Sequence, residues 1–189
     1  MIIGITGTLG AGKGTLVDHL VRTRGFRHYS VRGLLTRELE SAGWPVNRDT
    51  MTRLANDLRA THHPAILIQR LYEEAQAHGG DAIIESIRTP GEVDFLRATG
   101  PFVLVAVDAP LETRYARITE RASSTDDVDL ETFRQNEQRE MQATDPTRQN
   151  LSACIAMADK VFRNDGAVED FRTSIDEWLE EMDAEDTSS

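Results

Sequence analysis

A glycine-rich segment near the start of the chain has the composition of a loop that binds phosphate. It reads Gly-Thr-Leu-Gly-Ala-Gly-Lys-Gly-Thr from Gly7 to Thr15 and follows a short apolar run. Glycines let successive backbone N–H groups turn toward an anion, and a helix that starts there adds the positive end of its dipole. Lys13 supplies a full charge for the β- and γ-phosphates of a nucleotide. We therefore predict a P-loop whose nucleotide-binding residues are Gly7, Gly10, Ala11, Gly12, Lys13, Gly14 and Thr15.

Two acidic residues at the ends of apolar runs are candidates for a magnesium site. A carboxylate in the position of Glu85 is costly unless it is solvated, paired or close to a metal. Glu85 is therefore predicted to serve magnesium through water, together with the Thr15 hydroxyl, and a buried ion pair is the alternative that stays open. Gly14 stands where the general motif has Ser or Thr, so Thr15 carries the nearest hydroxyl. Asp108 is the rival acid for magnesium, although its position before a proline favours a helix cap.

Arginine is the second source of phosphate chemistry, because Lys13 and Lys160 are the only lysines among the 21 basic residues. A guanidinium group makes bidentate contacts with a phosphate, which an ammonium group does not. Arg88 follows a central apolar run, and open parallel sheets bind ligands at the carboxyl ends of such strands. We predict that Arg88 holds the phosphate of an acceptor.

Five further arginines lie in predicted helices. Arg117 and Arg121 are about one helical turn apart and are predicted to close over the transferring phosphoryl group. Arg114, on the same helix, is expected to be a solvated neighbour. Arg37 and Arg59 are each compatible with a phosphate ligand and with a solvated helix charge, so both interpretations stay open.

Alternating strands and helices must position these residues. Short apolar runs predict strands over residues 1–6, 26–30, 82–87, 102–107 and 160–163. Apolar residues three and four apart predict helices over residues 15–24, 31–42, 50–61, 66–78, 91–98, 111–121, 130–142 and 149–158. Asn47 and Asp49 are candidate caps, and a last helix is expected to end near Glu180. This order predicts the α/β class, with a parallel sheet covered by helices on both faces.

The composition limits the classes of protein that fit. A chain of 189 residues with 39% hydrophobic residues predicts one folded domain, residues 1–180, followed by an acidic, flexible tail at 181–189. A net charge of -11 argues against a nucleic-acid partner, and no apolar stretch approaches the roughly 20 residues that span a membrane. Cys154 is the only cysteine, which fits a reducing cytoplasm. Small-molecule nucleotides are therefore the expected partners, and the oligomeric state stays open.

Several motifs resemble those of known nucleotide kinases. The loop ending Gly-Lys-Gly-Thr is similar to that of adenylate kinase and related nucleoside monophosphate kinases. The segment from Ala82 to Arg88 resembles the strand in those kinases that ends in Asp-Gly-Phe-Pro-Arg, with Glu85 at the acid. Arg117 and Arg121 resemble the arginine pair at the base of the kinase lid.

A closer resemblance, to the adenylate kinase-related proteins of archaea, covers almost the whole chain. It is carried by residues 25–30, 34–38, 56–59, 87–88, 92–93, 158–159 and 164–166. The chain departs from that family at Glu85-Ser86, where Asp-Gly is usual. It also lacks the further lid arginine of true adenylate kinases between Arg121 and Asp126. Proteins of this family are often labelled as resembling dephospho-CoA kinase.

The resemblance implies a P-loop NTPase fold with a five-stranded parallel sheet, and ATP-dependent transfer of a phosphoryl group to a nucleoside monophosphate with the help of Mg²⁺. It implies that the acceptor binds to a helical insert over residues 31–78, through Ser30, Arg37, Arg59 and Arg88. It further implies a short lid over residues 122–129, and it places Asn164 and Gly166 beside the donor base. The residues implied in catalysis are Lys13, Arg88, Arg117 and Arg121.

Two other functions remain open. A dephospho-CoA kinase needs a general base to activate a ribose hydroxyl, whereas a monophosphate acceptor is already anionic. The second predicted strand carries Tyr29-Ser30 where such a base is expected, which weakens this alternative. A non-catalytic sensor that binds ATP or AMP is the alternative from another class, and the missing lid arginine favours it. The sequence does not decide the acceptor, nor whether the acidic surface reflects a high-salt habitat.

Overall fold

The computed structural model describes residues 1–121, 129–141 and 149–186. Its centre is a five-stranded sheet in the order β2-β3-β1-β4-β5, and every neighbouring pair of strands is parallel. The predicted fold class and five-stranded parallel sheet are therefore confirmed. The strands are β1 (Ile2–Gly7), β2 (Arg27–Ser30), β3 (Ala82–Glu85), β4 (Phe102–Asp108) and β5 (Lys160–Arg163).

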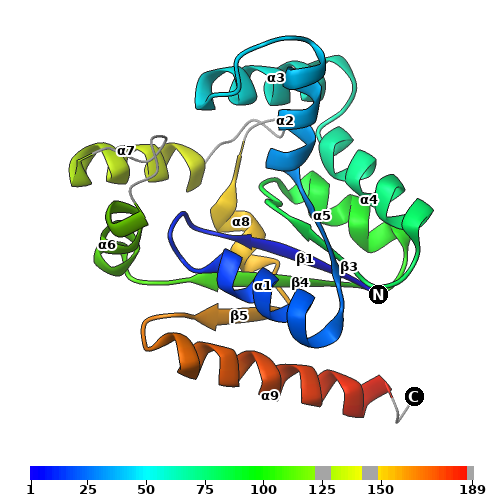
Figure 1. The fold of residues 1–189 in the computed structure, drawn as a ribbon, viewed down its shortest axis with the longest axis vertical. Helices are drawn as coiled ribbons and strands as arrows, with labels where there is room; N and C mark the ends of the chain where they lie inside the picture. Colours follow the sequence, from blue (N-terminus) through cyan, green and yellow to red (C-terminus); the bar gives the residue numbers. More distant parts are fainter. Residues whose placement is uncertain (122–128, 142–148, 187–189) are drawn as a thin grey trace.

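Helices connect the strands and cover both faces of the sheet (Figure 1). In chain order they are α1 (Lys13–Arg24), α2 (Val31–Ser41), α3 (Arg48–Thr61), α4 (Ile66–His78), α5 (Pro90–Thr99), α6 (Leu111–Arg121), α7 (Leu130–Met141), α8 (Leu151–Ala156) and α9 (Val168–Asp186). The predicted cap Asn47 forms a capping box with Thr50, whereas Asp49 lies inside the first turn of α3. None of the described helices is long and apolar enough to cross a membrane.

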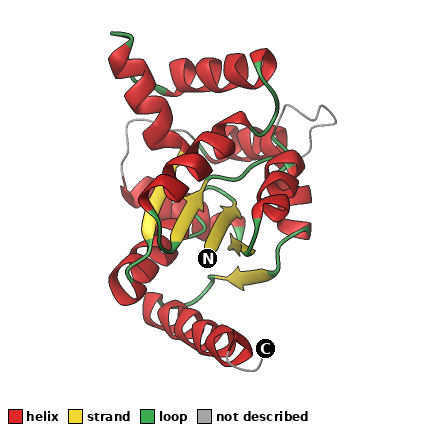
Figure 2. Ribbon diagram, turned by 90° about the vertical axis from the view of Figure 1, so that its right-hand side faces the viewer, coloured by secondary structure: helices red, strands yellow, loops and turns green. Residues whose placement is uncertain are grey.

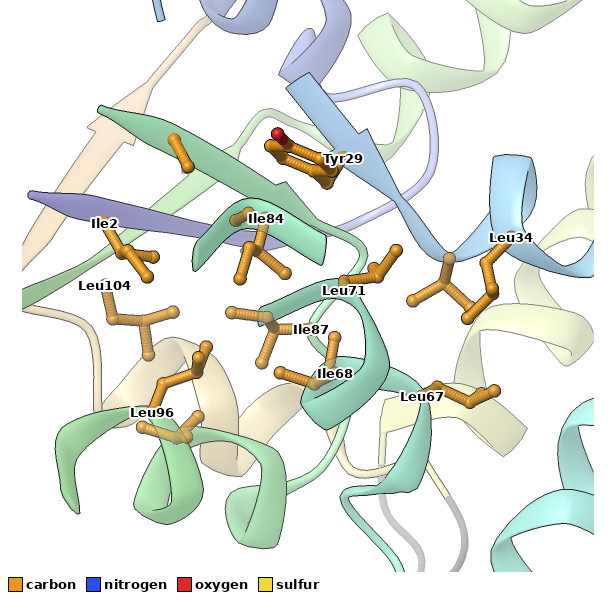
Figure 3. Close-up of a cluster of buried hydrophobic side chains, with 14 of the residues drawn as sticks. Ile2, Tyr29, Leu34, Leu67, Ile68, Leu71, Ile84, Ile87, Leu96 and Leu104 are labelled. Carbon is orange, nitrogen blue, oxygen red and sulfur yellow. The ribbon is translucent and has the colours of Figure 1, made fainter. Parts of the chain in front are cut away.

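One face of the sheet packs against α2, α4, α5 and α8. Because side chains alternate along a strand, Ile2 of β1, Ile84 of β3 and Leu104 of β4 all point to this face. They form one continuous buried cluster with helical side chains (Figure 3). The helical residues that close over the strands include Leu34, Leu67, Ile68, Leu71 and Leu96. This core holds the helices of the predicted acceptor insert against the sheet.

The opposite face packs against α1 and α9. Ile3 and Ile5 of β1 point to this side and are fully buried beneath α1. Trp178 of α9 meets Phe162 of β5 edge to face, with ring centroids 5.7 Å apart. Figure 2 shows the strands enclosed between helices. With both faces covered, the loops at the carboxyl ends of the strands are left to form a site.

The third strand ends before its apolar run does. β3 stops at Glu85, short of the predicted end at 87, because Ser86 adopts a left-handed backbone with a φ of 76°. The amides of Ser86 and Ile87 both donate to the oxygen of Ile5, at 3.1 and 3.2 Å, so the chain turns there. A residue other than glycine in this conformation carries strain of about 1–2 kcal/mol. The turn brings Glu85, Ser86 and Arg88 to the wall of one pocket.

Helix α9 continues past the predicted end at Glu180. It runs to Asp186, so the prediction of a tail that frays from residue 181 is wrong for the part of the tail that the structure describes. Met182 packs against the core on the α1 side, and Asp183 accepts a hydrogen bond from Arg24 at 2.6 Å. These contacts extend the helix beyond its apolar stripe. Residues 187–189 lie outside the described chain.

The predicted lid lies almost wholly outside the described residues. Of residues 122–129 the structure describes Asp129, which caps α7 by accepting a hydrogen bond from the amide of Thr132 at 2.7 Å. The lid therefore stays a prediction.

Helix α8 is shorter than the helix predicted over 149–158. It begins after Asn150, whose side chain caps it by accepting from the amide of Ala153, and it ends at Ala156.

Candidate active site

Asn164 holds the P-loop between β1 and α1. Gly12 caps α1 in a left-handed conformation, with a φ of 104°. The side-chain amide of Asn164 donates to the oxygen of Ala11 at 2.8 Å, and a Cβ atom on Gly12 would lie only 2.2 Å from the same nitrogen. Asn164 is itself buried, and its backbone N–H donates to the oxygen of Asp108. A residue that follows the edge strand β5 therefore sets the shape of the loop.

Gly12→Ala is expected to destabilise the protein by about 2–3 kcal/mol. The left-handed backbone costs a side chain about 1–2 kcal/mol, and displacement of Asn164 loses a buried hydrogen bond worth about 1 kcal/mol. The measurement is urea unfolding of the variant and the parent under identical conditions.

Gly14→Ala is the matched control, because nothing lies within 4 Å of a Cβ atom at this helical position. Alanine is a better helix former than glycine, so this variant should be as stable as the parent or more stable by up to about 1 kcal/mol. Equal unfolding midpoints for Gly12→Ala and Gly14→Ala would contradict the role given to Gly12 and Asn164.

Lys13 folds back onto the loop that precedes it. Its ammonium group donates to the oxygens of Gly7 and Thr8, at 3.0 and 2.8 Å. Burial, and then the positive charge of Arg88, lower the pKa of Lys13 from 10.5 to about 8. The predicted P-loop lysine is therefore half-buried and close to another positive charge, and an anionic ligand would lower the electrostatic cost of this arrangement.

The lowered pKa of Lys13 predicts that nucleotide affinity falls in mildly alkaline solution. Below a pH of about 8 the free protein carries the charged lysine that phosphate prefers, and above it the neutral form must first take up a proton. The bound phosphate raises the pKa again, so the dissociation constant of metal-free ADP should rise toward tenfold per pH unit above about pH 8. Lys13→Arg, which stays charged, should show a flat profile. The same decline in that variant would assign the titration to another group.

One pocket of about 580 Å³ collects the cationic side chains of the site. Its polar wall comes from the P-loop, α2, α3, the turn after β3, α6 and α7. The cationic residues that line it are Lys13, Arg32, Arg59, Arg88, Arg117 and Arg121. Only Glu85 and Glu140 bring carboxylates to it among the residues that the structure describes. In a chain with a net charge of -11, such a concentration of positive charge indicates an anionic ligand.

Arg88 lies in this pocket with Lys13, as its position after β3 predicts. Its NH1 nitrogen donates to Glu140 at 3.1 Å and to Gln149 at 2.6 Å. Its backbone N–H donates to Glu92 at 2.7 Å, which fixes the chain just before α5. The proximity of Arg88 to the P-loop agrees with a phosphate ligand, and the role itself stays a prediction.

The structure distinguishes Arg59 from Arg37, for which the sequence left the same two interpretations open. Arg59 is 4% exposed, lines the pocket and pairs with the buried Glu92 at 3.1 Å. Its Nε atom is buried without a hydrogen-bond partner within the described residues, which is costly until a ligand or water supplies one. Arg37 is more than half exposed, pairs with Glu74 at 2.8 Å and does not line the pocket. The solvated interpretation therefore describes Arg37.

Ser30 has a structural role in α2, and its implied contact with an acceptor stays a prediction. The Ser30 hydroxyl caps α2 by accepting the amide N–H of Gly33 at 3.0 Å, and Ser30 does not line the pocket. A short polar side chain just before a helix is compatible with a helix cap as well as with a ligand contact. In this structure Ser30 forms the cap.

Glu85 lines the pocket and accepts a hydrogen bond from His28 at 2.9 Å. Burial acts to raise the pKa of the Glu85 carboxyl, but the bond to His28 and the nearby charges of Lys13 and Arg88 lower it overall. An ionised carboxylate and the Thr15 hydroxyl, both on the pocket wall beside Lys13, fit the oxygen ligands that Mg²⁺ takes alongside phosphate and water. The donor set of this site therefore suits a nucleotide-bound magnesium ion.

Asp108, the rival acid, is engaged elsewhere. Its carboxylate accepts a hydrogen bond from the Thr8 hydroxyl at 2.9 Å and lies 4.0 Å from Arg114. It does not line the pocket that holds Lys13. Asp108 thus supports the outer side of the P-loop instead of forming the expected helix cap, and Glu85 is the better placed acid.

Arg117 and Arg121 both line the pocket from α6, as their spacing predicts. Arg117 also reaches the oxygen of Ala11 and the side-chain oxygen of Asn164, each at 3.4 Å. These contacts place its guanidinium beside the P-loop. The roles of both residues toward a transferring phosphoryl group stay predictions.

The expectation that Arg114 is solvated is wrong. Arg114 is 4% exposed, donates to the oxygens of Ala109 and Leu9, and forms a two-pronged ion pair with Glu137 of α7. Its guanidinium also lies 5.8 Å from the ring centre of Phe133. These partners come from three other segments, which compensates the burial of the charge. Arg114 therefore fixes α6 and α7 to the P-loop.

Asn164 and Gly166, which the resemblance places beside the donor base, lie outside the lining of this pocket, and that role stays a prediction. Asn164 is buried beneath the P-loop, and Gly166 is exposed; neither lines the pocket. The turn after β5 instead delivers Asn164 to the loop backbone. Its contribution to nucleotide binding, on this geometry, is to shape the phosphate cradle.

Three charged or amide side chains of the pocket were not predicted from the sequence. Arg32 sits in the first turn of α2, and Glu140 and Gln149 both contact Arg88. The spacing of Glu140 from Glu137 by three residues placed both on one face of α7, and this was the available signal. Arg32 offered none, because a single arginine in a predicted helix is usually a solvated charge.

Trp44 lies at the surface, in a loop whose later residues reach the pocket. It is 50% exposed in the loop between α2 and α3, where Arg53 lies 5.8 Å from its ring centre. The neighbouring Val46 and Asn47 line the pocket. This loop therefore forms the rim of the site on the acceptor side.

A protein-family profile described as an AAA domain (AAA_18) matches residues 3–145. The matched segment contains the P-loop, Arg88 and both pocket arginines of α6. The chain belongs to this AAA domain family. The finer resemblance to adenylate kinases stays a prediction.

This AAA domain is similar to curated proteins along nearly its whole length. A UPF0200 protein from Hyperthermus butylicus is 27% identical over 183 residues, covering 96% of this chain and 95% of the relative. A UPF0200 protein from Methanocaldococcus jannaschii is 26% identical, covering 96% and 90% of the two chains.

Solved structures confirm the fold of the AAA domain. The structure of TT1252 from Thermus thermophilus has a TM-score of 0.64 and 23% identity, covering 96% of this chain and 97% of that one. A shikimate kinase from Aquifex aeolicus has a TM-score of 0.59 and 16% identity, covering 97% and 99%. The domain therefore has a P-loop kinase-like fold.

Proposed function

We propose that the protein transfers the γ-phosphoryl group of ATP to a nucleoside monophosphate. The observation that carries this proposal is the shared pocket of Lys13 and Arg88, which approach it from the loops after the neighbouring strands β1 and β3. A P-loop lysine alone would suit any nucleotide-binding protein. The half-buried Arg88 in the same pocket supports a second phosphate-bearing ligand next to the first.

The donor half of the pocket is the P-loop. Its backbone amides and Lys13 would hold the β- and γ-phosphates of ATP at the positive end of α1. Thr15 and Glu85 would hold Mg²⁺, which supplies charge neutralisation on the phosphates when it is bound. Asn164 keeps the loop in the required shape through Ala11.

The acceptor half is lined by α2 and α3. Arg88 and Arg59 would bind the acceptor phosphate, because both arginines line the pocket. The apolar lining of this half suits the flat face of a nucleoside base, and it consists of Val31, Leu35, Val46, Met51 and Ala55.

Little covalent chemistry is required of the protein. An oxygen of the acceptor phosphate attacks the γ-phosphorus, the bond to the β-phosphate oxygen breaks, and ADP leaves with that bonding pair. The acceptor is already ionised, so no general base is needed. Lys13, Arg117 and Arg121 would balance the negative charge while Arg88 aligns the attacking group.

An acceptor screen tests the proposal. The protein is incubated with ATP and Mg²⁺ and each of the common nucleoside monophosphates or dephospho-CoA, and ADP formation is measured. ADP formation with a monophosphate supports the proposal. Formation with dephospho-CoA alone would favour the second candidate, for which Glu85 and Glu140 are the carboxylates within the pocket that could act as base. ATP binding without turnover on any acceptor would favour the non-catalytic sensor.

A further inference from the structure

Helix α7 directs two carboxylates at two arginines of the site. Glu137 and Glu140 are three residues apart and share one face of the helix. Glu137 pairs with Arg114, and Glu140 pairs with Arg88 at 3.1 Å. A single helix thus contacts both the support of the P-loop and the residue proposed to bind the acceptor.

The two ion pairs differ in accessibility. Arg114 is 4% exposed and is held by two backbone oxygens as well as by Glu137. Phe133 of α7 is also buried and packs against Tyr115, with ring centroids 5.7 Å apart. Arg88 and Glu140 keep 30% and 24% of their side-chain surface exposed, and both line the pocket. The first pair anchors α7, and the second is the one that a ligand reaches.

Glu140 stands where it opposes an incoming anion. NH1 of Arg88 has two hydrogens, and Glu140 and Gln149 provide an acceptor oxygen for each of them. A phosphate that binds through NH1 must displace Glu140. A phosphate that binds through the rest of the guanidinium group would lie next to a carboxylate of like charge.

We propose that Glu140 is an internal competitor for Arg88 and thereby sets the affinity of the acceptor site. Its carboxylate occupies Arg88 while the acceptor site is empty, and it gives way when the phosphate of an acceptor arrives. The exchange makes and breaks no covalent bond. Glu137 keeps α7 docked during the exchange, so only the end of the helix that carries Glu140 is released. This inference rests on the proposed function, which assigns Arg88 to the acceptor.

The test compares Glu140→Gln with the parent protein by calorimetry, with the donor site filled by ADP and Mg²⁺. The change keeps the shape of the side chain and removes its charge. AMP and inorganic phosphate, titrated separately, should each bind roughly five- to tenfold more tightly to the variant. In an Arg88→Gln background the gain should vanish, because the competition needs both partners.

Glu131→Gln is the matched control, since it removes the same charge from the same helix. Glu131 is exposed and pairs with Arg134 at 3.6 Å, away from the pocket lining. Its affinities for both probes should stay within about twofold of the parent. Glu140→Asp keeps the charge with a shorter reach and should lie between the parent and Glu140→Gln.

Unchanged or weaker phosphate binding by Glu140→Gln would overturn the proposal and make Glu140 a residue that orients Arg88. Phosphate binding by neither protein would overturn it as well, because Glu140 would not then be what keeps anions from Arg88. Failure of the proposed function gives a different result. AMP would bind neither protein, while the phosphate titration would still show whether Glu140 competes.

Discussion

Lys13→Ala is expected to weaken ATP binding and to lower turnover by about a thousandfold. The substitution removes the one positive charge that the P-loop itself brings to the β- and γ-phosphates, and removing a single such contact costs about two to three powers of ten in rate. The protein should remain folded, because the side chain donates to two loop oxygens but packs no apolar core. The measurements are ATP affinity by calorimetry, turnover with the acceptor found in the screen, and the thermal unfolding midpoint.

Lys160→Ala is the matched control, since Lys160 is the only other lysine in the chain. It lies on β5 and pairs with Glu181 at 3.8 Å. Neither residue lines the pocket. ATP affinity and turnover should equal those of the parent. An equal loss in both variants, or no loss in Lys13→Ala, would remove Lys13 from the donor site.

Arg88→Lys is expected to lower turnover by about ten- to a thousandfold and to raise the KM for the acceptor. Lysine keeps the charge but loses the planar fork that holds a phosphate at two points, so the acceptor is no longer aligned for in-line attack. At about 1.4 kcal/mol per tenfold, this is a loss of about 1.4–4 kcal/mol of transition-state stabilisation. ATP affinity without acceptor should change by less than about twofold, because the donor phosphates rest on the P-loop.

Arg37→Lys makes the same chemical change at an exposed arginine outside the pocket lining. Its acceptor KM and turnover should match those of the parent. Two results for Arg88→Lys would contradict this prediction. Unchanged acceptor kinetics would mean that Arg88 has only a structural role, in its contacts with Glu140 and Gln149. A fall in ATP affinity as large as the fall in acceptor affinity would place Arg88 on the donor side.

The sheet and the P-loop could be predicted from the sequence because their signals are local. Apolar runs of strand length, a glycine loop and helical periodicity each occupy a few consecutive residues, and Lys13 lies at a fixed place in its motif. Arg88 was also predictable, since it follows a strand whose carboxyl end must face the site in a parallel sheet.

The burial of individual arginines could not be predicted, because it depends on partners far away in the chain. Arg37 and Arg59 both lie on helices of the insert, but only Arg59 meets a buried carboxylate, Glu92, 33 residues further on. Arg114 is buried because Glu137 and two loop oxygens compensate its charge. Periodicity shows which face of a helix is apolar, and it does not show which cation will find a buried anion.

The two tryptophans lie in opposite surroundings, which gives the protein two optical reporters. Trp44 is 50% exposed on the rim of the acceptor side, and Trp178 is 5% exposed on the far face of the sheet. The emission of Trp44 should therefore respond to a ligand that binds at this rim, whereas that of Trp178 should shift when α9 leaves the core. Trp178→Phe leaves a label-free fluorescence signal for the rim, and Trp44→Phe leaves one for unfolding.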